Sequence, residues 1–331
     1  MSEQTPTQNI FYQIKNQTWA AAAMLAGMEL DLFTPLGSGP LTVQQLAAEL
    51  QVRGEKLAPL LYALVIAGLL TEQDGVFSNT ADTDAYMVRG RPGFLGDTYK
   101  IWSRNLKASL KTAESIQTGL PQAKYDWKNM PKEELKSLHE GMASGSDEYA
   151  EWLSSTFDFS QCRSVLDAGG GSGAVAIEMT KIHPQMKATG VDMPEVTPIT
   201  EEFILEADAA DKVSVISADL AAGPIPGEYG AALLSAVIQT VSAGEARRVI
   251  KNIGDVMKPG GWLYITGSGI LENSRLSPRT AVEMNLVFIN VYDHGQSFTE
   301  AEHREWLGEA GFEDIHFVYE ESMIRARKRT N

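Results

Sequence analysis

A glycine-rich stretch near the middle of the chain combines a carboxylate with closely spaced glycines. It reads Val165-Leu-Asp-Ala-Gly-Gly-Gly-Ser-Gly173, and it lies between a predicted strand and a predicted helix. Glycines at such a turn allow the backbone to approach a ligand closely, and the helix that begins beyond them offers free N–H groups. Asp167 places a carboxylate at the end of the strand, beside the same turn. The stretch therefore predicts a cofactor-binding loop.

Two kinds of cofactor fit the spacing of this loop. Gly169, Gly171 and Ala174 match the G-x-G-x-x-A spacing of dinucleotide-binding turns. Asp167 argues against a dinucleotide, because a carboxylate beside a pyrophosphate is repelled by its like charge. S-adenosylmethionine carries a sulfonium and an ammonium, which an adjacent carboxylate attracts, and Gly173 leaves room for its methionine part. We therefore predict S-adenosylmethionine as the cofactor, with Asp167, Gly169 and Gly171 among its contacts.

Two further acids follow the next two predicted strands. Asp192 lies roughly 20 residues beyond the loop, where a carboxylate can accept hydrogen bonds from both ribose hydroxyls. Asp219 follows the third strand and is predicted to accept a hydrogen bond from the adenine amino group. Met193 and Leu220, next in sequence to these acids, are predicted to pack on the adenine ring. Ligands bind at the carboxyl edge of such sheets, so three acids at three successive strand ends favour one shared site.

The elements that must position these residues follow an alternating order. From residue 161 onwards, short β-branched runs alternate with helical patterns, which is typical of a parallel sheet with crossover helices. The predicted strands span 164–167, 187–192, 213–217, 230–236 and 262–266, with a closing hairpin at 315–319 and 322–327. The predicted helices span 173–182, 194–207, 242–256 and 299–310. Capping boxes at Ser242 and Thr299 open the last two helices.

The N-terminal part has a different pattern, with helices predicted at 10–32, 43–50 and 55–67 and a hairpin around Asp74-Gly75. Three helices and a two-stranded wing are the order of a winged-helix domain, whose usual role is DNA binding. The helix at 55–67 carries only Lys56 as a basic residue, so a dimerising role is favoured. The first helix offers apolar side chains for burial: Trp19, Ala22, Met24, Leu25, Met28 and Leu30.

Composition and charge argue against several classes of partner. The 331 residues are 44% hydrophobic and 21% charged, an ordinary globular balance, and the net charge is −15. Such an acidic surface repels nucleic acid. Met1–Asn9 is polar, and no apolar run approaches the roughly 20 residues that span a bilayer, so neither a signal sequence nor a membrane contact is expected. Cys162 is the only cysteine, which excludes an intrachain disulfide and favours the cytoplasm.

Four phrases of the sequence carry a resemblance to a known family: Leu166-Asp-Ala-Gly-Gly-Gly-Ser-Gly173, Lys258-Pro-Gly-Gly261, Phe298-Thr299 and Glu309-Ala-Gly-Phe312. The chain resembles the Class I S-adenosylmethionine-dependent methyltransferases, and within them the caffeic-acid and acetylserotonin type of O-methyltransferase. This resemblance implies an α/β fold with a Rossmann-like, seven-stranded sheet and an α-helical, winged-helix dimerisation domain. It also implies a homodimer. We divide the chain into a dimerisation domain at 1–95, a helical connector to the substrate pocket at 96–160, and the catalytic domain at 161–331.

The same resemblance assigns several more residues to the site. Met142 and Ser144 match a family segment that touches the methionine end of the cofactor. Ser235 ends the fourth strand, where the family often has a basic residue, and is included among the cofactor contacts. Trp102, Phe288 and Tyr292 are predicted walls of the substrate pocket.

The family's catalytic residues do not carry over. Gln239 stands where the family has the histidine that acts as general base, and glutamine cannot take a proton near neutral pH. Gly267 and Ser297 stand where plant members have acids. His294 lies in a stretch that lines the substrate pocket of the family, and it is the alternative candidate for a base. No metal is expected, because iron-dependent relatives have a His-Asp pair where this chain has Gln239-Thr240.

These residues favour O-methylation of a small aromatic or natural-product substrate, achieved by positioning. Alignment of nucleophile, methyl and sulfur is worth several orders of magnitude in rate. Three alternatives stay open: methylation of nitrogen or carbon, a non-methylating reaction that uses the same cofactor, and a winged-helix regulator that senses the cofactor.

Overall fold

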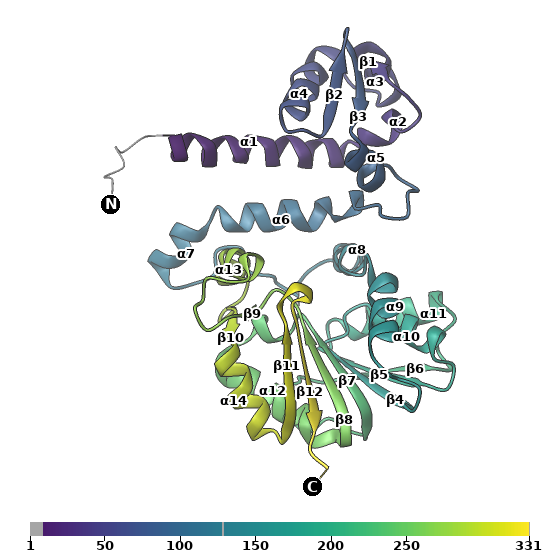
Figure 1. Cartoon of the computed structure of the whole chain (residues 1–331), viewed down its shortest axis with the longest axis vertical. Coiled ribbons are helices and arrows are strands. Elements are labelled where there is room, and N and C mark those ends of the chain that lie inside the picture. Colours follow the sequence, from purple (N-terminus) through teal and green to yellow (C-terminus); the bar gives the residue numbers. More distant parts are fainter. Residues whose placement is uncertain (1–8, 128, 331) are drawn as a thin grey trace. The chain divides into compact units, whose positions relative to one another are not determined.

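The computed structural model describes residues 9–127 and 129–330, so the predicted polar N-terminus lies outside the described residues except for Asn9. The chain divides into two compact units that meet at Arg104 and Asn105, and each is described by itself (Figure 1). No helix of the described residues is long and apolar enough to cross a membrane.

The N-terminal unit combines helices with a small antiparallel sheet of order β1-β3-β2. Its elements are α1 (Asn9–Glu29), α2 (Phe33–Leu36), β1 (Leu41–Thr42), α3 (Val43–Glu49), α4 (Gly54–Ile66), β2 (Leu70–Gln73), β3 (Val76–Asn79), α5 (Ala81–Met87) and the start of α6 (Tyr99–Ser109). Thr42 and Gln45 form a capping box that opens α3. The core packs Phe33 and Phe77 against Leu46 and Leu61, all nearly inaccessible to solvent.

Helix α1 buries only part of its predicted apolar face within this unit. Met28 is buried, and Met24 and Leu25 are half-buried against the core. Trp19 is 64% exposed, and Leu30, just beyond the helix, is 38% exposed. These two side chains, which the sequence offered for burial, are therefore not covered within the single chain.

The C-terminal unit is a seven-stranded sheet with helices on both faces. The first half of its elements comprises α7 (Thr112–Thr118), α8 (Lys132–Met142), α9 (Ser146–Thr156), β4 (Ser164–Ala168), α10 (Ala174–Ile182), β5 (Lys187–Asp192), α11 (Thr197–Glu206), β6 (Val213–Ser217) and β7 (Tyr229–Ser235). The second half comprises α12 (Ala243–Val256), β8 (Met257–Thr266), β9 (Ile270–Leu271), α13 (Arg279–Val291), β10 (Phe298–Thr299), α14 (Glu300–Glu309), β11 (Phe312–Val318) and β12 (Met323–Lys328). The predicted α/β class and sheet are confirmed.

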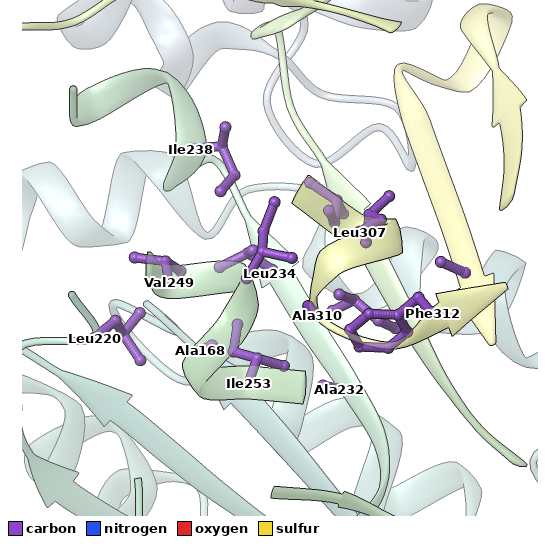
Figure 2. Packing of buried hydrophobic residues seen from close by; sticks show 14 of the residues in the cluster. Ala168, Leu220, Ala232, Leu234, Ile238, Val249, Ile253, Leu307, Ala310 and Phe312 are labelled. Atoms are coloured by element: carbon purple, nitrogen blue, oxygen red, sulfur yellow. The ribbon is translucent and has the colours of Figure 1, made fainter. Parts of the chain in front are cut away.

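Alternating side chains along each strand explain why both faces of the sheet are covered. On β7, Ala232 and Leu234 face one hydrophobic cluster, whereas Ala231 and Leu233 face another. The first cluster joins the sheet to α12 and α14, and Figure 2 shows Leu234 among side chains of those helices. The second joins it to α9, α10 and α11. Successive residues of a strand point to opposite faces, so each inner strand is apolar throughout.

The strand order brings the ends of the central strands together. The sheet runs β11-β12-β8-β7-β4-β5-β6, with β12 antiparallel to its neighbours and the strands from β8 to β6 parallel. The chain leaves β4 toward β5 and later returns to the other side of β4 as β7. The order therefore reverses at β4, and ligands of open α/β sheets bind at such a switch point, outside the carboxyl ends of the strands.

Candidate active site

The glycine loop at the end of β4 requires glycine for two reasons. Gly169, Gly171 and Gly173 have φ of 72°, 56° and 73°, a left-handed conformation that side chains disfavour. Neighbouring groups also occupy the space of a side chain. A Cβ at Gly169 would lie 2.1 Å from Val237 Cγ2, and one at Gly170 would lie 2.5 Å from Asp167 Oδ2. The loop is therefore held tightly against the acid that precedes it.

Asp167 is a buried carboxylate that lacks a counter-charge. Its side chain is 2% exposed, and Oδ2 has no hydrogen-bond partner among the described residues. Burial raises the pKa of Asp167 to about 7, and the nearby charge of Asp192 adds to the rise. A buried carboxylate without a counter-charge is costly in free energy, and a cationic ligand would offset that cost. The site thus fits a positively charged cofactor such as S-adenosylmethionine.

Asp192 ties the glycine loop to the end of β5. Its Oδ2 accepts a hydrogen bond of 2.8 Å from the Gly171 N–H, and its Oδ1 accepts one of 2.7 Å from the Met193 N–H. Burial raises the pKa of Asp192, and these two backbone hydrogen bonds oppose the rise. Each carboxylate oxygen has a second acceptor position, which leaves capacity for ribose hydroxyls.

The predicted adenine contacts differ in exposure. Asp219 is exposed, and its Oδ1 accepts a hydrogen bond of 2.8 Å from the Ala221 N–H, which closes a turn. Met193 is 42% exposed and free to pack on a ligand. Leu220 is buried in the hydrophobic cluster beneath α12, and its Cδ1 lies 3.9 Å from the Cβ position of Gly169. Leu220 therefore supports the glycine loop from below, and its contact with adenine stays a prediction.

The remaining predicted cofactor contacts come from two other segments. Ser235 lies at the end of β7, where its Oγ accepts a hydrogen bond of 3.0 Å from the Thr266 hydroxyl. Met142 ends α8 with 49% of its surface exposed, and Ser144 is exposed two residues later. Their part in cofactor binding stays a prediction.

Gln239 fits into a space bounded by two glycines. Its side chain is 6% exposed, and none of the described residues hydrogen-bonds its carboxamide. A Cβ at Gly269 would lie 2.6 Å from Gln239 Cβ, and one at Gly267 would lie 3.1 Å from Gln239 Nε2. Side chains at either glycine would thus press on the glutamine. Gly267, which stands where plant members of the family have an acid, therefore leaves the space that the Gln239 side chain occupies.

A pocket of about 250 Å³ has Thr240, the residue that follows Gln239, in its lining. Its lining includes Lys124, Tyr125, Trp127, Thr240, Val241, Glu245, Val291, Tyr292, Asp293 and His294. Tyr125 packs against Trp127 and Tyr292, with ring centroids 4.9 and 5.8 Å apart. Lys124 Nζ lies 2.5 Å from Asp293 Oδ2, which pairs the two charges.

The predicted pocket residues occupy three different positions. Tyr292 and His294 line this pocket, and Phe288 is buried next to Tyr292, with ring centroids 6.4 Å apart. Trp102 instead packs against the hydrophobic core of the N-terminal unit. Sequence reasoning did not assign Tyr125 and Trp127 to this pocket, and their aromatic character was the only signal for them.

His294 is exposed and faces an acid across the pocket. The pKa of Glu245 is lowered, mainly by a hydrogen bond from Ser242 and to a smaller extent by the charge of His294. Glu245 Oε2 also accepts from the Ser242 backbone N–H, as the capping box of α12 requires. No group of three or more His, Cys, Asp or Glu that could hold a metal ion occurs among residues 9–127 and 129–330.

Comparison with known families agrees with this site. Residues 111–313 match the O-methyltransferase domain family, and residues 12–89 match the O-methyltransferase dimerisation domain. The chain belongs to the O-methyltransferase family. It is an S-adenosylmethionine-dependent methyltransferase, with the glycine loop and the buried Asp167 at the expected edge of the sheet.

Similar proteins cover nearly the full length of the chain. The 3-hydroxy-5-methyl-1-naphthoate 3-O-methyltransferase of Streptomyces sahachiroi is 28% identical and covers 91% of this chain and 88% of its own length. The tetracenomycin polyketide synthesis 8-O-methyl transferase of Streptomyces glaucescens is 25% identical, with coverages of 92% and 91%. The solved structure of human N-acetylserotonin methyltransferase in complex with SAM has a TM-score of 0.83 at 22% identity, covering 100% of both chains.

Proposed function

We propose that this enzyme transfers a methyl group to an oxygen of a small aromatic molecule. The observation that carries the proposal is the pocket that Thr240 helps to line, whose walls include Tyr125, Trp127 and Tyr292. Aromatic walls bind flat aromatic ligands by stacking and edge contacts. Two similar enzymes are named as O-methyltransferases, one of a naphthoate and one of tetracenomycin polyketide synthesis, which supports an oxygen acceptor over nitrogen or carbon.

The chain's own residues bind and orient the two reactants in this proposal. When bound, S-adenosylmethionine supplies a methyl group that its sulfonium has already activated. Asp167 offsets the positive charge of the cofactor, and Asp192 accepts from the ribose hydroxyls. The other cofactor contacts are Gly169, Gly171, Met142, Ser144, Met193, Asp219, Leu220 and Ser235.

Gln239 orients the acceptor instead of deprotonating it. A carboxamide donates or accepts hydrogen bonds without taking a proton near neutral pH. A phenol that is acidic enough ionises by itself and loses its proton to solvent, so the enzyme has only to align the oxygen with the methyl group. Alignment of this kind accounts for several orders of magnitude in rate.

A second candidate gives His294 the role of base. It lines the same pocket, and Glu245 lies close enough to stabilise an imidazolium. Its exposure to solvent argues against strong activation, because water screens the interaction with the carboxylate.

The N-terminal unit supports a homodimer in this proposal. We assign it a winged-helix arrangement that serves dimerisation, because residues 12–89 match the dimerisation domain and α1 carries an exposed apolar surface. The segment 96–160 would then connect this domain to the pocket. We also propose a cytoplasmic location, which a single, half-buried cysteine supports.

The experiment combines product analysis with pH profiles. Purified enzyme receives S-adenosylmethionine with an isotopically labelled methyl group and a panel of hydroxylated naphthoates, anilines and keto acids. We expect label on a phenolic oxygen and stoichiometric S-adenosylhomocysteine. Label on nitrogen or carbon would contradict the oxygen acceptor, and product formed without consumption of the cofactor would overturn methyl transfer.

The pH profiles separate positioning from base catalysis. For two phenols of different acidity, the midpoints of kcat/KM against pH should differ by the difference in their pKa values. Gln239→Ala should lower kcat/KM by about tenfold to a hundredfold through lost orientation. Gln296→Ala, at a neighbouring exposed glutamine, is the control. A midpoint common to both phenols that disappears in His294→Gln would establish His294 as the base instead.

A further inference from the structure

The aromatic-walled pocket contains an acid that alignment of the two reactants does not use. Glu245, in the first turn of α12, lines this pocket together with the rings of Tyr125, Trp127 and Tyr292. Hydrogen bonds from the Ser242 hydroxyl and N–H lower the pKa of Glu245, so its carboxylate is charged near neutral pH. A pocket suited to flat rings thus also carries a full negative charge.

The capping box of α12 engages only one oxygen of this half-buried carboxylate. Glu245 Oε2 accepts hydrogen bonds of 2.9 Å from the Ser242 N–H and 2.6 Å from the Ser242 hydroxyl. Within the part of the chain that the structure describes, no residue hydrogen-bonds Oε1 or forms a salt bridge with Glu245. Arg248 and His294 act on its charge from beyond ion-pair distance, and Arg248 Nε donates instead to the Ala221 carbonyl. Oε1 therefore keeps its accepting capacity for a ligand.

The other two full charges of the described lining are paired with each other. Lys124 Nζ lies 2.5 Å from Asp293 Oδ2, so these charges largely cancel within the pocket. Glu245 therefore sets the sign of the described lining when His294 is neutral. A substrate with a carboxylate would be repelled by Glu245 and would have to displace Asp293 from Lys124, whereas a cationic substrate meets neither obstacle.

The aromatic walls favour a cation for a separate reason. The Tyr125 ring lies next to those of Trp127 and Tyr292, with ring centroids 4.9 and 5.8 Å apart. The faces of tryptophan and tyrosine rings attract ammonium groups as well as flat apolar ones. A carboxylate with an unused oxygen and several aromatic rings, all lining one pocket, is a combination that suits an amine attached to an aromatic ring.

We propose that the substrate is a phenol that also carries a basic amine, and that Glu245 binds the ammonium form of this amine through Oε1. This inference rests on the proposed function, and it deepens it by naming the chemical class of the substrate. Glu245 is then the residue that determines specificity, because it attracts amines and repels carboxylates, while the aromatic walls hold the ring.

Three phenols that differ at the end of a short side chain test this contact. Tyramine ends in an ammonium, para-ethylphenol in a methyl group and para-hydroxyphenylpropionate in a carboxylate. Calorimetry measures the Kd of each for the full-length enzyme saturated with S-adenosylhomocysteine. We expect tyramine to bind about tenfold more tightly than para-ethylphenol, as for a hydrogen bond to a charged group, and the carboxylate to bind most weakly. Added salt should reduce the advantage of tyramine, because Glu245 is only half-buried.

Two glutamine variants complete the design. Glu245→Gln removes the charge and keeps the capping box, since Gln45 fills the same position in the capping box of α3, so the Tm should stay near that of wild type. The Kd values of tyramine and para-ethylphenol should then agree within about twofold. Glu302→Gln is the matched control, because Glu302 fills this position in the capping box of α14 and does not line the pocket. It should keep the preference for tyramine.

The outcomes are distinct. Equal affinity of the wild type for tyramine and para-ethylphenol, tighter binding of the carboxylate, no binding of any of the three, or a preference for tyramine that survives Glu245→Gln would each overturn the inference. Preferential binding of tyramine that Glu245→Gln abolishes would support it. If tyramine binds in this way but receives no labelled methyl group from S-adenosylmethionine on its phenolic oxygen, the amine site stands and the proposed function is contradicted.

Discussion

Asp167 combines a stability cost with a proposed binding role at the scale of a single residue. Its carboxylate is buried and has one oxygen without a partner, and its pKa lies at about 7 instead of the ordinary 3.8. A carboxylate in this state destabilises the protein that lacks cofactor, and it attracts a cation strongly for the same reason. Natural enzymes often accept lower stability for a pre-formed binding group.

The Asp167→Asn variant should separate these two effects. The folded-state pKa lies above the unfolded value, so the stability from the protonated carboxyl is present below pH 4 and is lost as pH rises toward 7. The Tm of the cofactor-free wild type should therefore fall between pH 5 and pH 8, whereas that of Asp167→Asn should stay nearly level and exceed it at pH 8 by about 3 °C or more. Affinity for S-adenosylmethionine should fall by about tenfold or more.

Thermal scans and calorimetry at several pH values measure both quantities. Asp219→Asn is the control for stability, because the Asp219 carboxylate is exposed and only accepts the Ala221 N–H hydrogen bond that closes a turn. A wild-type Tm that rises from pH 5 to pH 8 would contradict the assignment of an uncompensated charge to Asp167.

The residues of the site divide into those that local sequence predicts and those that it does not. Asp167 and Asp192 could be found because each follows a short apolar strand, and strand ends of a parallel sheet meet at one edge. Tyr125 could not, because its segment precedes the sheet in sequence. Tyr125 is placed by a hydrogen bond from its N–H to the Val291 carbonyl, a contact that no periodicity reveals.

Among the elements, those with strong local signals were predicted best. The strands at 187–192 and 213–217 have the predicted bounds, and the capping boxes predicted at Ser242 and Thr299 both form. Strand β8 begins at Met257 rather than Trp262, because the pairing of β8 with β7 shifts register near Gly260 and Gly261 instead of ending in a separate turn. Helix α13 was not predicted as a helix, since its apolar residues have no capping signal at Pro278.

Asn290 of α13 links three elements around the pocket. Its Oδ1 accepts a hydrogen bond of 2.6 Å from the Ser115 hydroxyl of α7, and its Nδ2 donates one of 3.0 Å to the Thr112 hydroxyl. Its backbone carbonyl oxygen accepts a hydrogen bond of 2.8 Å from the Ala123 N–H, and Ala123 lies two residues before Tyr125. This fully buried asparagine therefore fixes one wall of the pocket to the helix that forms the opposite wall.

The Asn290→Leu variant should loosen that wall. The Ser115 hydroxyl then loses its buried acceptor, which costs about 1–3 kcal/mol of unfolding free energy in urea titrations. KM for the aromatic substrate should rise more than the Kd of S-adenosylhomocysteine, because Asn290 positions the pocket and not the glycine loop. A Ser115→Ala/Asn290→Leu double variant removes the unpaired hydroxyl and should recover part of the stability. Equal weakening of both ligands would contradict the positioning role.

At the scale of the whole molecule, the N-terminal unit leaves an apolar surface that a single chain does not cover. Phe11, Ile14 and Trp19 on α1 are exposed by 71%, 58% and 64%. Monomeric proteins rarely expose large side chains of this kind along one helix, and such surfaces mark interaction sites. The match of residues 12–89 to a dimerisation domain favours a second copy of the chain as the partner.

Introducing charged side chains on the exposed apolar surface of α1 should therefore dissociate the expected dimer. In Phe11→Lys/Trp19→Lys, two apolar side chains of the proposed interface become cations, so association would require burying unpaired charges. We expect wild type to have the mass of a dimer, and the variant that of a monomer, by light scattering coupled to size-exclusion chromatography at micromolar concentration. Leu276→Lys is the control, because Leu276 is 81% exposed in the C-terminal unit and should not affect the mass. A dimeric double variant would place the interface elsewhere, and a monomeric wild type would contradict the homodimer itself.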